Sequence, residues 1–474
     1  MRKLGVLIAL FLVFGLAPGV FGAEFAFHGD MNHRFAYTNH NEWIKGSDQQ
    51  GLLQNGSVND FFGEIKYRLW FEAATNEKNV KGVFATEIGG LRFGERGSAE
   101  FSGDQIRMEV RWAYVDFQCP WSDNKNRFKV GLQPFKVNPY LWSETVAGIN
   151  LDGAVGNIDY QLAWQRGYEV DVSTKEDGES DVDSFLARIF TKPTDGMKAG
   201  VFALYQTYDD DDDDPADFSP ITSRGYQIKK FTQRNEAPDN RNPPSIDILT
   251  LGVDGSYAKN NFFVNWDVMY QTGDIEDIAF DDTEFSGVVQ SGAFDLSAYF
   301  AHFDLGYKMG KAKFTYTFWY ASGDDNPNDR DFDAFITTDI DRADSISIME
   351  GNYADDNYFT EDVSLLDKGL ILNKLALDYS ATDKTTVGAA ILYMLTAEDI
   401  QYTDNSGRSQ KEDEIGIEVS GYMKYMLYKN LEFAVNAGYL FAGDAMDAFE
   451  VDEIKNGSSD EDIFIASSRI RYKF

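Results

Sequence analysis

Residues that usually carry enzyme chemistry are few in this sequence and poorly spaced for it. The chain has 474 residues but only 4 His and 1 Cys. Three of the His, His28, His33 and His40, lie close together, but none has the spacing of the zinc-binding H-E-x-x-H motif. A Gly-x-Ser-x-Gly nucleophile elbow and a phosphate-binding glycine loop are also missing from the sequence. These observations predict that the protein is not an enzyme.

Carboxylates are the chemically active groups that the sequence has in excess. Asp and Glu number 78 against 43 Lys and Arg, which gives a formal net charge of -35. Five segments account for 31 of these net charges: 170–183, 209–245, 274–292, 324–366 and 444–460. One interpretation is a set of solvated loops whose charges repel one another. The other is divalent-cation binding, because hard cations prefer clustered carboxylate oxygens.

The candidate cation ligands lie in two of these segments. They are Asp209, Asp211 and Asp213 in a run of six aspartates, and Asp329, Asp331 and Asp333 in the stretch DRDFDAFITTDI. The second set begins like a calcium loop, but Ala334 and Ile340 stand where an EF-hand has Gly and Glu. We therefore expect no cofactor beyond loosely bound Ca2+ or Mg2+. The basic patches that bind nucleic acid are missing.

The other charged residues alternate with hydrophobic ones at a period of two, which indicates β-strands. Ten residues tilted near 45° cover roughly 23 Å, the height of the apolar band of a membrane barrel. The hydrophobic face, which includes Met108, Val110 and Trp112, is expected to meet lipid, and His302 to lie in the interfacial belt. The charged residues expected to line a wet interior are Glu64, Lys66, Arg68, Arg107, Glu109, Arg111, Lys313, Arg469 and Arg471.

Two interpretations of these interior charges stay open. Facing rows of opposite sign create a transverse field in a pore, which orders small polar solutes. The charges can instead pair across neighbouring strands. Both can hold in the same barrel.

Short turns and longer segments alternate along the chain. The short turns are 75–79, 122–126, 156–157, 192–197, 258–261, 308–311, 381–385 and 428–430. The longer segments are 38–60, 94–105, 138–149, 170–183, 209–245, 274–292, 324–366, 398–412 and 444–460. A soluble β-sandwich has no reason to alternate in this way, whereas an up-and-down outer-membrane barrel has short periplasmic turns and long extracellular loops. We predict an all-β antiparallel barrel of eighteen strands, or of sixteen if 138–156 is all loop.

The N-terminus looks like a secretory signal peptide. Arg2 and Lys3 precede an apolar run from Leu4 to Ala17, and small residues follow. The run is shorter than the roughly 20 residues of a membrane-spanning helix. We expect cleavage after Gly22 or Ala23, which leaves residues 23–474 as one barrel domain.

The C-terminal strand and one connection have features of their own. Tyr472 and Phe474 are expected to face the bilayer in a last strand that closes on the first, and an aromatic C-terminus looks like the assembly signal of bacterial outer-membrane barrels. The connection 138–149 is more apolar than the others. We expect it to fold inward and narrow the channel through Tyr140, Trp142 and Glu144; the alternative places Tyr140 and Trp142 in the aromatic belt of an interfacial strand.

Four elements between residues 60 and 170 resemble the outer-membrane homotrimeric porins of sulfate-reducing bacteria. They are Glu87 to Gly89, Ala113 to Asp116, Val130 to Gln133 and Val146 to Gly148. The resemblance implies a trimeric porin in the outer-membrane lipid, inserted by the barrel assembly machinery, that lets small hydrophilic solutes diffuse passively. The six-aspartate run and the long 324–366 segment depart from that pattern.

Three functions follow as hypotheses from these observations. A general diffusion porin is the leading one, with modest cation preference expected from the acidic loops. A substrate-selective channel would need a dense ladder of one charge sign or of aromatics along the lumen. A barrel whose acidic loops serve adhesion or divalent-cation binding is the third.

Overall fold

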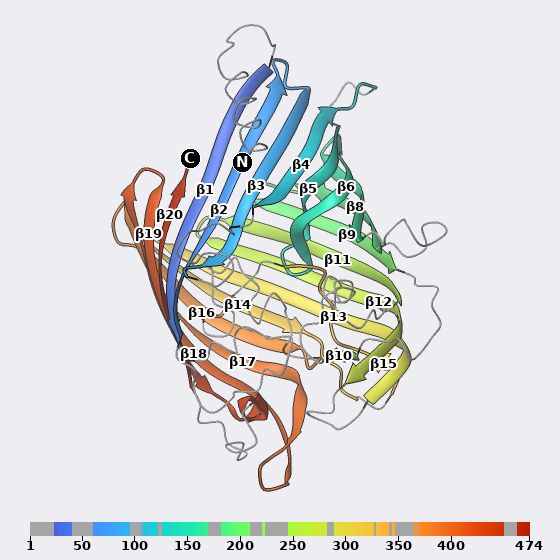
Figure 1. Ribbon diagram of the computed structural model, residues 1–474, viewed down its shortest axis with the longest axis vertical. Coiled ribbons are helices and arrows are strands. Elements are labelled where there is room, and N and C mark those ends of the chain that lie inside the picture. The colour runs from blue at the N-terminus through green and yellow to red at the C-terminus, as the bar shows by residue number, and fades with distance from the viewer. Residues whose placement is uncertain are drawn as a thin grey trace.

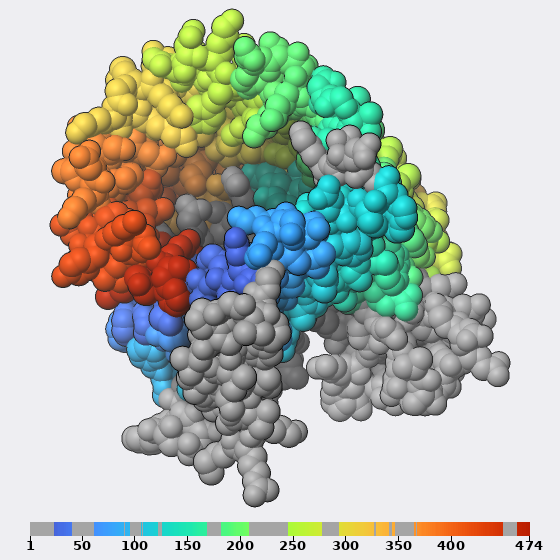
Figure 2. Space-filling view, turned by 90° about the horizontal axis from the view of Figure 1, so that it is seen from above, coloured from blue at the N-terminus to red at the C-terminus, as the bar shows by residue number. Residues whose placement is uncertain are grey.

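Eighteen long strands, each antiparallel to its neighbours, close into one barrel. The computed structural model describes residues 23–39, 60–94, 106, 108–121, 126–168, 182–208, 220–222, 245–281, 289–326, 329–340, 344–346, 365, 367–449 and 462–474. The first strand, β1, pairs with β2 on one side and with the last strand, β20, on the other, so that the sheet closes on itself. Seen along the barrel, the strands surround a hollow (Figure 2), and the two terminal strands run side by side.

The strand bounds follow the predicted pattern (Figure 1). They are β1 (Ala23–Thr38), β2 (Asp60–Thr75), β3 (Val80–Arg92), β4 (Glu109–Gln118), β5 (Arg127–Asn138), β6 (Trp142–Val155), β7 (Ile158–Tyr168), β8 (Val182–Thr191), β9 (Met197–Tyr208), β11 (Ser245–Lys259), β12 (Phe262–Asp281), β13 (Val289–Met309), β14 (Ala312–Ala321), β16 (Leu370–Ser380), β17 (Thr385–Thr403), β18 (Ser409–Tyr428), β19 (Leu431–Ala442) and β20 (Ile463–Lys473).

All eight predicted turns lie between consecutive strands, which confirms the alternation of short and long connections. Lys78, Asn260 and Asn430 adopt positive φ in three of these turns. Such tight reversals need left-handed backbone, which Asn tolerates better than most residues.

Several longer segments are more regular than the sequence predicts. Strand β6 begins at Trp142, so most of 138–149 is strand and not loop. Long strands also take up most of 274–292 and 398–412, because extending a hairpin keeps backbone N–H and C=O groups paired. The signal-peptide segment and the Asp209, Asp211 and Asp213 run lie outside the described residues.

Two short parallel strands cover places where a long strand has a shorter neighbour. Strand β15 (Asp331–Phe332) pairs with β13 beyond the last residue of β14, and β10 (Pro220–Thr222) pairs with β12 beyond the first residue of β11. Both supply partners to backbone groups that would otherwise form an open edge.

The outer face of the barrel is apolar. Phe27, Leu251 and Leu305 expose between 45% and 59% of their surface, and every second residue along the strands shares this direction. Phe474, Tyr472 and Ile470 lie on the same face, with Arg469, Arg471 and Lys473 on the other. No helix within the described part of the chain is long and apolar enough to cross a membrane.

Trp112 faces the interior, and the prediction that it meets lipid is wrong. The register between β3 and β4 shifts at Ala85 and Thr86, so Arg111 and Trp112 both turn inward. The Trp112 ring packs against Trp70, and its Nε1 donates to Thr145 Oγ1 at 3.2 Å. A β-bulge adds one residue to one strand and moves the following side chains to the other face.

Candidate functional site

Two parts of the inner wall differ sharply in chemistry. The inner faces of β20, β1, β2, β3 and β4 carry charged side chains, and we call them the charged wall. The inner faces of β9 and β11 to β14 carry mainly buried hydrophobic side chains, and we call them the apolar wall. Two segments lie inside the barrel against the apolar wall: the tip, Pro139–Leu141 between β5 and β6, and the inner loop, the described residues 322–326 and 329–340 after β14.

The tip crosses the lumen, as the expectation of an inward fold implies. Tyr140 is fully buried, and its ring lies 4.9 Å from that of Phe300, 4.6 Å from that of His302 and 5.4 Å from that of Trp319. Asn138 Nδ2 donates to Asp267 Oδ1 at 2.6 Å. Strands β12 to β14 therefore hold the end of the β5–β6 hairpin.

The inner loop follows the same wall, which corrects the prediction that 324–366 is wholly an extracellular loop. Gln271 of β12 acts as a clamp: its Nε2 donates to Ile336 O at 2.7 Å, and its Oε1 accepts from Ile336 N at 2.9 Å. Thr338 Oγ1 donates to Gln206 of β9, and Phe335 packs on Phe300 with ring centroids 5.3 Å apart. This part of the acidic segment lies inside the barrel because its apolar side chains pack against the apolar wall.

The loop also touches the tip, and residues 344–346 contact strands β16 and β18. Ser143 N donates to Asp339 O at 2.8 Å, which joins the loop to β6. Lys374 Nζ donates to Asp344 O at 2.6 Å, and Glu418 accepts hydrogen bonds from Ser345 and Ile346. The lumen is thus crossed by chain segments bound to strands on several sides.

Asp324 lies buried at the start of the inner loop, beyond the end of β14. Burial, together with the charge of Asp367, raises the pKa of Asp324 to about 7. Lys368 Nζ, which donates to Asp324 O at 2.9 Å and to Asp367 Oδ2 at 3.1 Å, opposes that rise only in part. The outer end of this wall therefore carries a carboxyl group that titrates near neutral pH.

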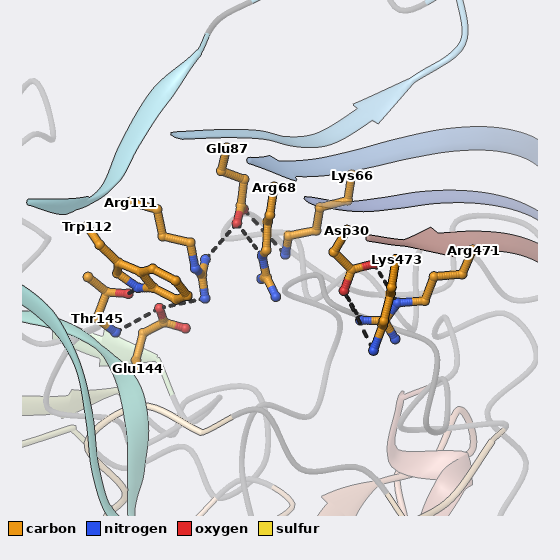
Figure 3. Close-up of polar contacts among 10 residues, drawn as sticks. All are labelled: Asp30, Lys66, Arg68, Glu87, Arg111, Trp112, Glu144, Thr145, Arg471 and Lys473. Carbon is orange, nitrogen blue, oxygen red and sulfur yellow. Dashed lines mark hydrogen bonds and ion pairs between the residues drawn. The ribbon is translucent and has the colours of Figure 1, made fainter. Parts of the chain in front are cut away.

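Three cationic side chains surround one carboxylate at the centre of the charged wall (Figure 3). Glu87 Oε2 accepts from Arg68 Nε at 2.5 Å and from Arg111 Nη1 at 2.7 Å, and Lys66 Nζ lies 3.7 Å from Oε1. Arg111 Nη2 also lies 3.3 Å from Glu144 Oε1 on β6. One buried carboxylate thus holds three cationic side chains.

A second group repeats this arrangement next to the barrel closure. Asp30 of β1 accepts from Arg471 Nε at 2.7 Å, and Lys473 Nζ lies 3.8 Å from its Oδ2. Figure 3 shows this group on the same wall as the Glu87 group. The side chains of Arg68, Arg111 and Arg471 remain partly exposed to the lumen.

The other predicted lining residues are spread around the wall. Glu64 pairs with Arg34 at 2.5 Å, Arg469 with Glu432 at 2.5 Å and Lys313 with Asp378 at 3.7 Å. Glu109 lies opposite Glu87 in the β3–β4 register. Arg107 lies outside the described residues. Pairing across neighbouring strands is therefore present in the wall. Glu87, Glu109 and Glu144 match Lys66, Arg68 and Arg111 in number, whereas Asp30 has two cations, Arg471 and Lys473.

The described cation-ligand candidates do not form a metal site. Within the described part of the chain, no three His, Cys, Asp or Glu side chains converge as a metal ion requires. Asp329 instead caps its own turn: its Oδ1 accepts from Asp331 N at 3.1 Å, and its Oδ2 accepts from Asn326 Nδ2 at 2.7 Å.

Two features of the interior differ from what the sequence predicts. His302 points into the lumen beneath the tip, not into the interfacial belt. The inner loop had a signal in the sequence: Phe335, Ile336 and Ile340 stand in an otherwise acidic segment, and such side chains seek a buried surface.

Comparisons with solved structures agree with the barrel. OccAB1 of Acinetobacter baumannii shares 11% identity over 94% of this chain and 97% of that chain, with a TM-score of 0.51. OccK8 (OprE) of Pseudomonas aeruginosa shares 10% identity over 95% and 98%, with a TM-score of 0.49. The outer membrane protein opdK of P. aeruginosa shares 9% identity over 95% and 99%, with a TM-score of 0.47. No protein-family model and no curated protein sequence matches.

At this level of identity the likeness shows the fold. The chain has the closed eighteen-stranded barrel of outer-membrane porins. Its apolar outer face needs hydrocarbon around it, and a closed antiparallel barrel of this kind belongs in the bacterial outer membrane. The comparisons give no support to the closer resemblance to porins of sulfate-reducing bacteria.

Proposed function

We propose that the protein is a channel for passive diffusion of small hydrophilic solutes and ions across the outer membrane. The observation that carries the proposal is a closed barrel whose outer face is apolar and whose inner wall holds partly exposed Arg68, Arg111 and Arg471. Charged side chains need water, so the interior contains a hydrated path beside the tip and the inner loop.

Reconstitution in planar bilayers tests this function. Purified protein is expected to give stepwise conductance, and an empty-detergent control should give none. A folded barrel without any conductance would contradict the proposal. Foldedness is checked on the same sample by its heat-modifiable migration in SDS gels.

Selectivity for anionic solutes is the second candidate, and the two cations that share Asp30 favour it. The acidic loops favour cations at the mouth instead. A KCl gradient separates the two because the sign of the reversal potential reports which ion passes more easily. A preference for cations would instead support general diffusion in which the acidic loops at the channel mouth set the ion preference.

Adhesion or divalent-cation binding by surface loops is tested by deletion of 209–244 alone. The inner loop must stay, because it packs inside the barrel. Unchanged conductance with lost surface binding or lost Ca2+ binding would favour this role. Unchanged binding would exclude it for that loop.

Two partners remain proposals that rest on the resemblance and on the C-terminal strand. A homotrimer predicts a detergent-corrected mass near three chains by light scattering, and a monomer would remove it. Recognition of Tyr472 and Phe474 by the barrel assembly machinery predicts that deleting Phe474 lowers the amount of folded barrel in cells. The same deletion should have a smaller effect on folding in detergent.

A further inference from the structure

His302 holds a position that the channel function does not require. Its ring lies on β13 beneath the tip and is 97% buried. Both ring nitrogens face carboxylates: Nδ1 lies 2.8 Å from Asp267 Oδ2, and Nε2 lies 3.3 Å from Asp304 Oδ1. The Tyr140 ring lies against the imidazole at 4.6 Å.

The protonation state of this ring decides whether both contacts are favourable. A neutral imidazole has one N–H and one lone pair, whereas an imidazolium has two N–H donors. Ionised carboxylates only accept hydrogen bonds. The neutral ring must therefore turn a lone pair toward one of the two carboxylates, and the imidazolium donates to both.

The two carboxylates already have donors of their own. Asp304 accepts from Thr317 Oγ1 at 2.6 Å and from Asn265 Nδ2 at 3.1 Å. Asp267 accepts from Asn138 Nδ2 at 2.6 Å. The His302 ring therefore lies between two carboxyl groups that each already accept a hydrogen bond from another side chain.

Several carboxylates surround the His302 ring, so loss of the proton from an imidazolium there removes a positive charge that is close to the contacts of the tip. Beyond Asp267 lies Asp254 of β11, which pairs with Arg188 of β8. Asp254 lies opposite Asp267 in the β11–β12 register, and Asp304 lies on the other side of the ring. Without the imidazolium, the cation that remains in these contacts is Arg188, beside Asp254. The same Asp267 binds Asn138, and the Tyr140 ring loses the cation beneath it, which removes a cation–π attraction.

We propose that His302 is a positioning residue that holds the β5–β6 tip on the apolar wall when protonated and releases it when neutral. The positioning of the tip does not depend on the proposed channel function. Only the effect of that positioning on solute passage rests on it. Glu144, six residues after Asn138, contacts Arg111 of the charged wall, so movement of the tip changes the path between the two walls.

The first test reads the β6 end next to the tip and does not depend on conductance. A spin label is placed at Ser143→Cys in a Cys119→Ser background, and its mobility is recorded between pH 5 and pH 9 in detergent. We expect an immobile label at pH 5 and a several-fold larger mobile fraction at pH 9. Equal mobility at both values would overturn the proposal.

Substitutions at His302 separate positioning from simple packing. His302→Gln carries no positive charge at any pH and is expected to show the mobile label at every pH. His302→Lys keeps a cation and should hold the tip up to pH 9. His33→Gln, on the outer face beside Tyr67, is the matched control and should keep the pH profile. A wild-type pH profile in His302→Gln would overturn the proposal.

Single-channel recordings then connect the tip to passage. Switching between conductance levels should become several-fold more frequent above the pH at which the label is freed, and His302→Gln should switch at every pH. A mobile label with unchanged switching would contradict the link to passage. Complete lack of conductance would contradict the proposed function, while the label would still report on the tip.

Discussion

The charged wall and the apolar wall are built from the same alternating strands but satisfy their inner side chains in different ways. On the charged wall, partners come from neighbouring strands: Arg68 and Glu87 are 19 residues apart and directly opposite in register. On the apolar wall, partners come from far along the chain: Gln271 and Ile336 are 65 residues apart, and Asn138 and Asp267 are 129 apart.

The charged wall satisfies its side chains within the sheet. The apolar wall needs other chain segments to cover its hydrophobic side chains. Ion pairs within a sheet satisfy charges and leave the lumen wet. Buried Phe300 and Leu296 must exclude water, so chain segments are drawn into the lumen against them. The narrowing of the channel is therefore a consequence of hydrophobic residues on one side of the wall.

The largest expected effect comes from uncovering the apolar wall. Phe335→Asp places a charge in a fully buried site, at a cost of several kcal/mol, and should expel the inner loop. Single-channel conductance is expected to rise severalfold. Phe335→Leu keeps the site apolar and should leave conductance near the wild-type value. If both variants conduct alike, the loop does not narrow the path.

The next effect tests whether the charged wall governs ion choice. Arg68→Glu combined with Arg111→Glu reverses two cations beside Glu87. The anion-to-cation permeability ratio should fall about tenfold for each 1.4 kcal/mol of added barrier to anions. Lys313→Glu, on β14, is the matched control, and its shift should be smaller. Equal shifts would mean that the two sides contribute alike.

A smaller effect concerns the stability of the loop as pH changes. The pKa of Asp324 is raised to about 7, above its usual value of about 3.9. The folded state therefore binds this proton more tightly, and stability falls as pH rises between these values. Asp324→Asn should raise the guanidinium midpoint at pH 8 and leave it nearly unchanged at pH 4. A midpoint that falls at pH 8 would show that the charge is stabilising.

The smallest effect tests the inward turn of Trp112. Trp112→Phe removes the hydrogen bond to Thr145 and should lower the free energy of unfolding by about 1 kcal/mol. Trp266→Phe, in β12, is the comparison. Urea unfolding in detergent measures both variants. The same loss at both positions would contradict a special inward contact for Trp112.

Local pattern was enough to predict most of the barrel. Turns such as 156–157 and 428–430 coincide with strand ends because turn residues and strand period are properties of neighbouring residues. Trp112 was placed on the wrong face because a bulge depends on how two strands pair, which no single strand reveals. His302 was misplaced because its partners Asp267 and Tyr140 come from other hairpins.

The sequence by itself determined that odd and even residues face different surroundings and that Phe474 and Arg471 lie on opposite faces. Those properties depend on a repeat of two residues. Only the tertiary structure decided which side of the lumen is covered and that the stretch from Phe332 to Ile340 turns inward. Such contacts join residues that are far apart in the sequence and come together only when the barrel closes. A local two-residue repeat therefore cannot predict them.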